Sequence, residues 1–418
     1  MVVRILLLGS GAREHAILTA LLAENAGHEV TVAPGNAGIA DDAETIALDP
    51  ENPGLVADFA ADNGIELVII GPEAPLVAGV ADAVRARRIP VFGPGRAAAQ
   101  LESSKAFAKR VMDAAGVPTG RAVRAGTLEE VAAALDDFGA PHVVKADGLA
   151  AGKGVLVTPD RDAALGHAEH FLQLGPVLVE EFLDGQEVSL FLLADGSTVL
   201  PLSPAQDFKR VDDGDTGPNT GGMGAYSPLP WLPAGFVQEV VDTVALPVIR
   251  QLASEGTPFS GLLYCGLIVT SKGLRVIEFN ARFGDPETQV VLPRLTTPLS
   301  GLLLAAATGA LGGLPHPEFS DDACVTVVLA SEGYPDASQT GRPITGLETA
   351  AAVPGVNVLH AATARDGDLL LATGGRVLSV VARAGDFAEA RERAYRAIGA
   401  IGLEGSHYRT DIALRVAE

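Results

Sequence analysis

The sequence predicts a multidomain protein of mixed α/β and α+β class, with an open parallel sheet in its N-terminal part. Short apolar strands alternate with Ala-rich helical stretches over residues 1–101. Beyond residues 333–335 the pattern changes to short strands of antiparallel appearance at 368–372 and 376–383, followed by a helix near 387–398. The length of 418 residues also suits about three domains of ~150 residues each.

Four apolar segments account for the N-terminal sheet, and a turn rich in Gly or Pro follows each of them. Repeated strand–helix units of this length form an open parallel sheet, whose ligands bind at the carboxyl ends of the strands. We therefore expect a ligand at these turns. A helix over 103–115 then leads into mixed strands and helices up to about residue 324. The predicted strands cover 3–8, 29–32, 67–70 and 90–92, and the turns cover 9–11, 34–36, 71–73 and 93–95.

Composition restricts the possible functions. A net charge of −22 disfavours binding to nucleic acid or to anionic membranes, and 48% hydrophobic residues favour packed cores over disorder. Cys265 and Cys324 show no zinc-like spacing, and so few cysteines are typical of a reducing cytoplasm. The apolar run after Met1 is too short for a signal peptide, and no run of 18 apolar residues occurs. We expect a soluble, cytoplasmic protein with small-molecule partners.

The first glycine turn, Gly9-Ser10-Gly11, lies between a predicted strand and a predicted helix. Backbone N–H groups at such a helix start bind anions, and Arg13 adds a positive charge. Glu14 stands where a dinucleotide fingerprint requires glycine, and no acidic residue follows the second strand. A small phosphorylated ligand therefore fits better than NAD, while a plain tight turn is the alternative.

A glycine-rich loop between two predicted strands carries Lys145 at its start and Lys153 at its end. Its spacing excludes a P-loop, but such a hairpin can fold over a triphosphate, with N–H groups and lysines on the phosphate oxygens. An ordinary hairpin with solvated lysines is the alternative. Because the chain contains only six lysines, two of them around one glycine loop favour the phosphate site.

Strict alternation over residues 276–280 predicts a strand with Glu278 and Asn280 on one face. A carboxylate and an amide oxygen at this spacing suit Mg²⁺ beside phosphates. If the strand continues, Arg282 shares the face and places a cation next to the metal. The alternative is a half-exposed strand whose polar residues face water.

Two further segments carry weaker signals. Residues 177–189 form a strand, an acidic hinge and a second strand; the hinge backbone could bind an adenine edge and Glu187 ribose hydroxyls, or the segment is simply an acidic turn. Residues 207–226 form a long Gly-rich loop, which is typical of a functional loop, and its Lys209-Arg210 pair suggests an anionic substrate. The histidines show no catalytic spacing, and we expect most of them at surfaces or in turns.

Taken in order, seven segments resemble the ATP-grasp ligases and, among them, the phosphoribosylamine–glycine ligases, also called glycinamide ribonucleotide synthetases. The resemblance extends to residues 408–412. One departure is Phe208, where this family usually has His before the Lys-Arg pair. The segments are GSGAREHA, PGNAG, GPEAPL, VVKADGLAAGKGV, EEFLDGQEVS, NTGGMGAYSP and EFNARFGDPETQ.

The resemblance implies three parts: a substrate domain at 1–101, an ATP-grasp domain at 102–325 with a small ATP lid at about 118–190, and a small α+β domain at 326–418. It implies that glycine is joined to 5-phosphoribosylamine while ATP becomes ADP and phosphate. A glycyl phosphate is the intermediate, and the reaction is the second step of de novo purine synthesis. It also implies a monomer.

The resemblance further assigns residues to roles. For the metal, Mg²⁺ or Mn²⁺, it implies Glu278 and Asn280; for catalysis it implies Arg282, Lys145 and Lys153. For ATP it implies Lys105, Lys145, Gly148, Gly152, Lys153, Glu180, Glu181, Leu183 and Glu187. For the two co-substrates it implies Gly9, Gly11, Arg13, Asn36, Gly38, Glu73, Asp207, Lys209, Arg210, Asn219, Gly221, Gly222 and Arg282.

Three alternatives stay open. An ATP-grasp carboxylase that activates bicarbonate would share the nucleotide machinery, although AQDFKR and NTGGMGAYSP point away from it. A nucleotide-binding regulator without catalysis is opposed by the intact metal pair, the phosphate lysines and Arg282. An NAD-dependent dehydrogenase is disfavoured by Glu14 and the missing acidic residue.

Overall fold

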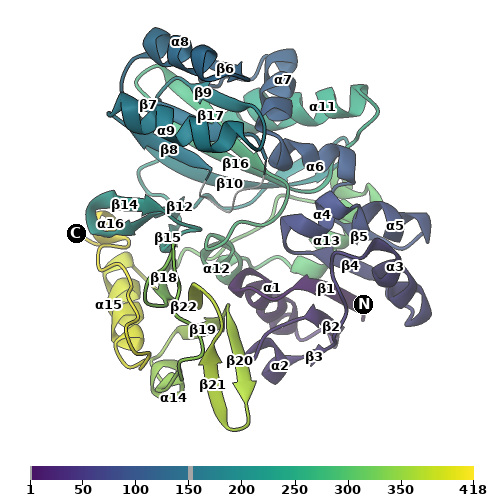
Figure 1. Cartoon of the computed structure of the whole chain (residues 1–418). Coiled ribbons are helices and arrows are strands. Elements are labelled where there is room, and N and C mark those ends of the chain that lie inside the picture. Colours follow the sequence, from purple (N-terminus) through teal and green to yellow (C-terminus); the bar gives the residue numbers. More distant parts are fainter. Residues whose placement is uncertain (1, 149–153) are drawn as a thin grey trace.

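The computed structural model describes residues 2–148 and 154–418 (Figure 1). The predictions for Gly152 and Lys153 lie outside these described residues. Within them, no helix combines the length and the apolar character that crossing a membrane requires.

The N-terminal part forms the predicted parallel sheet, in the order β3-β2-β1-β4-β5. In the register of this sheet, Ile5 of β1 pairs with Val30 of β2 and Leu67 of β4. The strands are β1 (Arg4–Gly9), β2 (Glu29–Pro34), β3 (Glu44–Thr45), β4 (Leu67–Ile70) and β5 (Val91–Phe92). The helices are α1 (Ala12–Ala23), α2 (Ile39–Asp42), α3 (Pro53–Asp62), α4 (Glu73–Ala78), α5 (Val80–Ala86) and α6 (Arg96–Ser103).

Strand β1 is buried on both faces, which explains its continuous apolar run. Ile5 and Leu7 belong to the same core cluster as Leu18 of α1, whereas Leu6 and Leu8 belong to the cluster of α3 and α5. The four predicted turns all follow the carboxyl ends of strands, as expected. The sequence did not predict β3, because two residues without an apolar run give no periodic signal.

The central part contains two antiparallel sheets, in the orders β6-β9-β7-β8 and β11-β10-β16-β17. Helices α8 and α9 cover one face of the first sheet, with Val131 and Ala164 packing against Val144 of β7 (Figure 1). The strands are β6 (Ala122–Ala125), β7 (His142–Ala146), β8 (Val155–Thr158), β9 (Val177–Glu180), β10 (Gly185–Asp195), β11 (Val199–Pro201), β16 (Ser260–Thr270) and β17 (Gly273–Asn280). The helices are α7 (Lys105–Ala115), α8 (Leu128–Phe138), α9 (Arg161–Leu172), α10 (Phe236–Val240), α11 (Leu246–Ser254), α12 (Thr288–Val291) and α13 (Leu299–Thr308).

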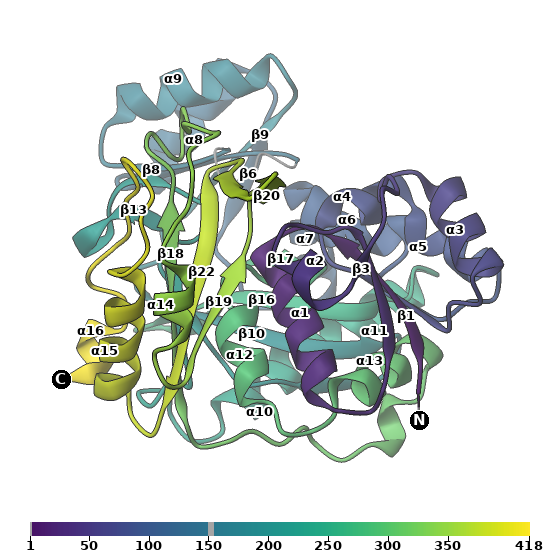
Figure 2. The same ribbon diagram turned by 90° about the horizontal axis from the view of Figure 1, so that it is seen from below.

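The C-terminal part is an antiparallel sheet in the order β12-β15-β18-β22-β19. Helix α15 contacts β18 and β22, while α1 contacts β19 and α12 contacts β18 (Figure 2). The strands are β12 (Gln206–Asp207), β13 (Arg210–Asp212), β14 (Thr216–Asn219), β15 (Gly224–Ser227), β18 (Ala323–Ala330), β19 (Val356–His360), β20 (Thr363–Asp366), β21 (Leu369–Ala372) and β22 (Arg376–Ala384). The helices are α14 (Leu347–Ala351), α15 (Phe387–Ile398) and α16 (Leu414–Ala417).

The predicted strands at 368–372 and 376–383 and the helix at 387–398 are confirmed as β21, β22 and α15. The domain boundaries stay predictions. Strands β12 and β15, which precede the predicted boundary at 325/326, pair into the same sheet as β18, which crosses that boundary.

Two buried histidines join the N-terminal and C-terminal parts. The backbone N–H of His360 donates to Nδ1 of His15 at 2.9 Å, and Nε2 of His15 lies 3.1 Å from Oδ2 of Asp42. Because Nδ1 accepts, His15 is held as its Nε2–H tautomer. The expectation that most histidines lie at surfaces or in turns is wrong for His15, His142 and His360, which are buried.

The His15–His360 contact predicts acid sensitivity. Burial, followed by the neighbouring His15, lowers the pKa of His360 from 6.5 to about 4. The unfolded chain therefore binds this proton at a higher pH than the folded chain does. The free energy of unfolding should fall by about 3 kcal/mol as the pH falls from 6.5 to 4. Urea unfolding of wild type and His360→Asn across this range measures the loss, which the variant lacks; the exposed His316→Asn is the control. Parallel curves for wild type and His360→Asn would contradict the prediction.

Candidate active site

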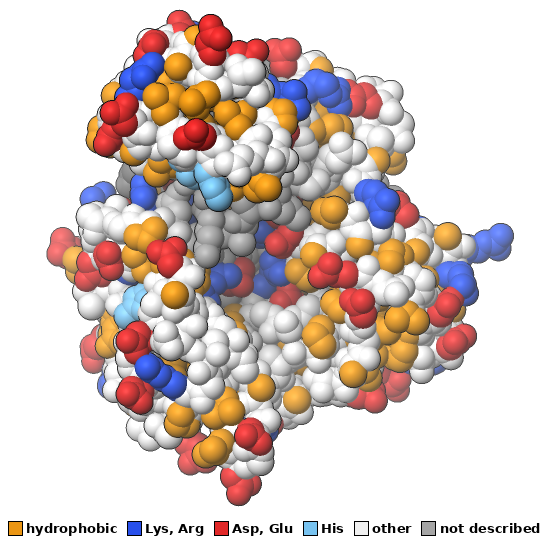
Figure 3. Space-filling model, viewed as in Figure 1, with side chains coloured by type: hydrophobic (Ala, Val, Ile, Leu, Met, Phe, Trp, Pro, Cys, Tyr) orange, Lys and Arg blue, Asp and Glu red, His pale blue; other side chains and the backbone are white. Residues whose placement is uncertain are grey.

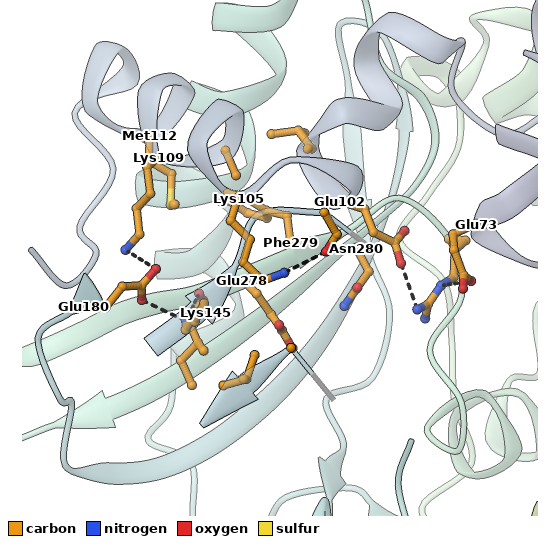
Figure 4. Close-up of a pocket in the computed structure, with 17 residues that line it drawn as sticks. Glu73, Glu102, Lys105, Lys109, Met112, Lys145, Glu180, Glu278, Phe279 and Asn280 are labelled. Atoms are coloured by element: carbon orange, nitrogen blue, oxygen red, sulfur yellow. Dashed lines mark hydrogen bonds and ion pairs between the residues drawn. The ribbon is translucent and has the colours of Figure 1, made fainter. Parts of the chain in front are cut away.

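A cleft of about 820 Å³, open to solvent, lies between β7, β17, α7 and the start of α4. Figure 3 shows a hollow on this face, with Lys and Arg side chains beside Asp and Glu side chains at its floor. Eight of the predicted site residues line the cleft, so the tertiary structure brings together groups separated by up to 209 positions. These eight residues are Glu73, Lys105, Lys145, Gly148, Glu180, Glu278, Asn280 and Arg282 (Figure 4).

Glu278 and Asn280 project from the same face of β17 into the cleft, as the alternation predicted. The strand ends at Asn280, however, so the condition under which Arg282 would share this face is not met. Arg282 follows in a bend, and its side chain is held by residues of the N-terminal part. Glu278 and Asn280 therefore enter the cleft from the strand, whereas Arg282 enters it from the bend that follows.

Positive charges surround Glu278. Nζ of Lys209 lies 3.5 Å from Oε1 of Glu278 and 2.9 Å from Oε2 of Glu187. Burial raises the pKa of Glu278, but the charges of Lys209, Lys145 and Lys105 outweigh it, and the net pKa lies below the usual value. Glu278 is thus a carboxylate at neutral pH, the form that coordinates a hard cation.

Two of the three lysines predicted for phosphate, Lys105 and Lys145, lie on the same side of the cleft as Glu278, and Nζ of Lys145 is 3.5 Å from the carbonyl of Ile277. Nζ of Lys145 lies 2.8 Å from Oε2 of Glu180, and Nζ of Lys105 donates to the carbonyl of Gly148 at 3.2 Å. Burial lowers the pKa of Lys105, against the opposing effect of Glu278. The Glu180 carboxylate is therefore paired with lysines, and its predicted contact with ATP stays a prediction.

The rest of the acidic hinge is more open. The Glu181 carboxylate accepts the backbone N–H of Arg121 at 3.2 Å, and Leu183 packs beside Gly120. Glu187 is exposed apart from its ion pair with Lys209. These three residues follow Glu180 at the edge of the cleft, and their predicted contacts with adenosine stay predictions.

Arg282 lies between two carboxylates. Nη2 is 2.8 Å from Oε1 of Glu102, and Nε is 3.5 Å from Oε2 of Glu73 (Figure 4). The other oxygen of Glu102 accepts the backbone N–H of Ala281 at 2.8 Å, so this buried carboxylate fixes both the guanidinium and the backbone before it. Burial lowers the pKa of Arg282, but Glu102 and Glu73 outweigh it and raise it overall.

The segment predicted to bind substrate adjoins the cleft where Lys209 faces Glu278. Thr220 N–H donates to the carbonyl of Lys209 at 2.7 Å, which ties the loop to that lysine. Gly222 has a φ of +107°, and a Cβ there would lie 2.3 Å from Cδ of Pro286 and 2.8 Å from Oδ1 of Asp207. Only glycine fits this crossing. Oδ1 of Asp207 is buried without a hydrogen-bond partner, and burial followed by the nearby Glu287 raises the pKa of Asp207.

Two predicted substrate residues point elsewhere. Arg210 donates to the carbonyl of Gly217 at 2.7 Å within the β13–β14 hairpin, and the amide of Asn219 reaches the carbonyl of Val155 at 3.5 Å. Phe208 packs under the guanidinium of Arg409 at 4.9 Å, so an aromatic face replaces the family's imidazole. Roles for Arg210 and Asn219 in substrate binding stay predictions.

The first glycine turn is filled by its own helix. The Glu14 carboxylate accepts the N–H of Gly11 at 2.6 Å and lies 2.5 Å from Nε of Arg13. A Cβ at Gly9 or Gly71 would lie 2.6 Å or less from Glu14 side-chain atoms. Arg13 is therefore buried and paired with Glu14, and the N–H of Gly11 is bound within the chain. The predicted substrate roles of Gly9, Gly11 and Arg13 stay predictions.

Asn36 and Gly38 hold the N-terminal and C-terminal parts together. The Asn36 amide donates to the carbonyls of Ser10 and His360, both at 2.8 Å, and accepts from Gly38 and Ile39. A Cβ at Gly38 would lie 2.5 Å from the His360 ring. The side chain of Asn36 therefore has no hydrogen-bonding capacity left, and its binding role would have to use the backbone.

The chain is similar to known proteins over nearly its whole length. Three family models of phosphoribosylglycinamide synthetase match the chain in order: the N domain at residues 3–102, the ATP-grasp (A) domain at 103–288 and the C domain at 324–415. The phosphoribosylamine–glycine ligase of Leifsonia xyli is 72% identical over 99% of this chain and 100% of its own. The chain belongs to the phosphoribosylamine–glycine ligase family.

Other members of the phosphoribosylamine–glycine ligase family are also similar to this chain in sequence and structure. That of Streptomyces coelicolor is 59% identical over 99% of both chains. The crystal structure of the enzyme from Thermotoga maritima matches with a TM-score of 0.84 and 33% identity over 98% of this chain and 100% of that one. The biotin carboxylase domain of Hydrogenobacter thermophilus 2-oxoglutarate carboxylase matches at 0.70 with 18% identity over 98% and 92%, which shows a shared fold only.

Sequence reasoning missed two cleft residues of this ligase. Nζ of Lys109 lies 3.5 Å from Glu180 and donates to Thr119 Oγ1 at 2.9 Å and to the Gly120 carbonyl at 3.0 Å. Two features of the sequence could have indicated Lys109: lysine is rare in this chain, and Lys109 follows Lys105 by four residues, which places both on one face of a helix. Glu102 gave no such signal, because its partners Ala281 and Arg282 are about 180 residues away.

Proposed function

We propose that the cleft of this C–N ligase binds ATP, glycine and 5-phosphoribosylamine together, with the residue roles described below. The observation that carries the proposal is the convergence of three kinds of group on one cleft: the lysines Lys105 and Lys145, the oxygen pair Glu278 and Asn280, and the cation Arg282. Such an arrangement suits transfer of a phosphoryl group from ATP to a carboxylate, for which positioning and charge neutralisation supply most of the catalysis.

The donor set fits Mg²⁺, with Mn²⁺ as a substitute. Within residues 2–148 and 154–418, no three His, Cys, Asp or Glu side chains gather as metal ligands. Mg²⁺ needs no such cage, because it binds one or two protein oxygens and completes its shell with phosphates and water. Glu278 and Asn280 would hold it, and it would neutralise charge on the ATP phosphates. The fold-sharing domain from Hydrogenobacter thermophilus was crystallised with MgADP, which supports the choice.

Two chemical steps follow. The glycine carboxylate attacks the γ-phosphorus, and the bond to the ADP oxygen breaks to give glycyl phosphate and ADP. The amine of phosphoribosylamine then attacks the glycyl carbonyl, phosphate leaves, and the nitrogen loses a proton to give the amide. Lys105 and Lys145 bind phosphate oxygens, and Arg282 stabilises charge that develops on the acyl phosphate. Lys153 would add a third cation from the glycine loop.

The substrate side would be formed by Asp207, Lys209 and Gly221–Gly222, which adjoin the cleft through the contact of Lys209 with Glu278. Lys209 already lies between Glu187 and Glu278, so it connects the nucleotide end with the acceptor end. The turns at Gly9–Arg13 and Asn36–Gly38 would face the ribose phosphate and would use backbone N–H groups other than those of Gly11 and Gly38, which are bound within the chain. The predicted monomeric state and cytoplasmic location stay predictions; every proposed contact comes from a single chain.

Release of ADP tests the proposal. The full-length protein is incubated with ATP and Mg²⁺, and each co-substrate is omitted in turn; phosphoribosylamine is generated in the cuvette from ribose 5-phosphate and ammonia. We expect release only when glycine and phosphoribosylamine are both present. ADP release that depends on added bicarbonate would instead assign the chain to the ATP-grasp carboxylases. If no ADP were released under any of these conditions, a nucleotide-binding protein without catalysis would be favoured.

Lys109 gives a separate test of the nucleotide side. Because its ammonium holds Glu180 and the carbonyl of Gly120, Lys109→Met should loosen the hinge proposed to bind adenine. We expect the KM for ATP to rise roughly tenfold, since a hydrogen bond to a charged group contributes about 1.5–3 kcal/mol, while the KM for glycine stays within twofold. Lys272→Met, in the turn between β16 and β17, is the control. An unchanged KM for ATP would separate Lys109 from nucleotide binding.

A further inference from the structure

Arg376, at the start of β22, reaches out of the C-terminal sheet toward the proposed substrate loop. Nη1 donates to the carbonyl of Asp285 at 2.9 Å and to the carbonyl of Gly221, and Nη2 donates to Oδ2 of Asp285 at 2.9 Å. A single guanidinium therefore joins two loops that are more than 60 residues apart in the sequence. Only a planar fork of donors reaches the carbonyl and the carboxylate of one residue together.

A second C-terminal residue holds the same loop from its other side. The hydroxyl of Tyr334 accepts the N–H of Gly221 at 3.0 Å. The Tyr334 ring lies on Gly375, where a Cβ would be 2.2 Å from the ring. Both polar groups of Gly221 are thus bound by residues of the C-terminal part, and Gly375 places Tyr334 next to Arg376. We call Tyr334, Gly375 and Arg376 the C-terminal clamp.

The clamped loop is coupled to the cleft. Gly222 crosses Pro286 so closely that a Cβ would be 2.3 Å from the proline ring, and Asp207 lies directly beside it. Thr220 binds the carbonyl of Lys209, whose ammonium faces Glu278. A shift of Gly221 would therefore move the wall that carries Asp207 and Lys209. The polar contacts found for Lys105 and Lys145 within the described residues are with Gly148, Glu180 and Ile277, and none is with this loop.

We propose that Arg376 is a positioning residue for the ligation: with Tyr334, it sets the distance between the 219–222 loop and the 284–286 turn, and so shapes the wall that receives the two co-substrates. The C-terminal part then contributes to substrate affinity as well as to folding. This inference rests on the proposed assignment of Asp207, Lys209 and Gly221–Gly222 to the substrate side. It does not require that Arg376 touch a substrate.

The test is a comparison of Michaelis constants in the full-length protein. For Arg376→Met we expect the KM of glycine, of phosphoribosylamine or of both to rise at least tenfold, with the KM of ATP within twofold of wild type. Arg383→Met is the matched control, because Arg383 lies on the same strand but binds Asp322 and the carbonyl of Pro293, away from the cleft. It should leave all three constants unchanged. A purely structural role would move all constants together or lower only the amount of folded protein, and either result would overturn the proposal.

Two milder variants keep the test decisive if Arg376→Met does not fold. Tyr334→Phe removes one hydroxyl and keeps the ring on Gly375, and Arg376→Lys keeps the charge without the fork. We expect both to raise the co-substrate constants about threefold or more, again with ATP unaffected; unchanged constants in both would overturn the inference. Wild-type ADP release that requires both co-substrates is measured alongside, so that failure of the clamp is distinguished from failure of the proposed function.

Discussion

Glu278→Gln should lower kcat for ADP release roughly 100-fold to 1000-fold. The substitution keeps the shape of the side chain but removes the charge that Lys209, Lys145 and Lys105 surround. Without it, the metal pair retains only neutral amide oxygens, which bind Mg²⁺ poorly. The three lysines would then face one another without their shared carboxylate. The loss should be smaller at high Mg²⁺ concentration, since weaker binding is partly overcome by mass action.

The measurement is ADP release at saturating glycine and phosphoribosylamine over a range of Mg²⁺ concentrations. Glu239→Gln, an exposed carboxylate on α10, is the matched control and should behave as wild type. ATP turnover that is unchanged in Glu278→Gln would show that the proposed metal role is wrong. A loss that does not depend on Mg²⁺ would instead assign Glu278 to the ordering of the lysines.

Arg282→Lys should reduce kcat/KM for glycine roughly 100-fold or more, which corresponds to about 2.7 kcal/mol. Lysine keeps the positive charge but cannot span Glu102 and Glu73 while also presenting a donor to the acyl phosphate. Because neither carboxylate belongs to the nucleotide side of the cleft, the KM for ATP should change less than threefold. The expected signature is thus a loss in the acyl step with nucleotide binding preserved.

Steady-state kinetics with each substrate varied in turn separate these effects. Arg275→Lys on β17 is the control, since the one polar partner of its guanidinium among the described residues is the neighbouring carbonyl of Leu274, at 2.7 Å. Should Arg282→Lys retain activity within threefold of wild type, Arg282 would be a structural partner of Glu102 alone. Thermal unfolding of the variant accompanies the kinetics, because Glu102 is buried and needs its counter-ion.

Local patterns predicted the N-terminal sheet and its turns well, because a buried parallel strand is a continuous apolar run that ends in Gly or Pro. They also predicted the face shared by Glu278 and Asn280, since a strand alternates with a fixed period of two. The strand does not continue to Arg282, because it ends at Asn280 and Glu102 accepts the next backbone N–H. Nothing near residue 281 in the sequence signals that distant carboxylate.

The chemistry of single residues was harder to predict than their presence in the site. Lys209, expected to bind an anionic substrate, lies between Glu187 and Glu278, and the Glu180 side chain serves lysines. Asn36 was expected to bind a ligand, but its amide joins the first turn to the C-terminal sheet. In each case the partner is a charged or backbone group brought in from another part of the chain, and its position depends on the packing of whole elements.

The sequence by itself determined the class of this protein: seven ordered motifs identified the ligase family, and periodicity and turn residues determined the main strands of the N-terminal sheet and the face shared by Glu278 and Asn280. These features are local, since they depend on residue type and spacing. Only the tertiary structure decided which charges meet. Arg282 between Glu102 and Glu73, Lys109 on Glu180, and Arg376 across Gly221 and Asp285 all pair groups far apart in sequence. Electrostatic and hydrogen-bond partners are chosen by distances in space, which the order of residues along the chain does not encode locally.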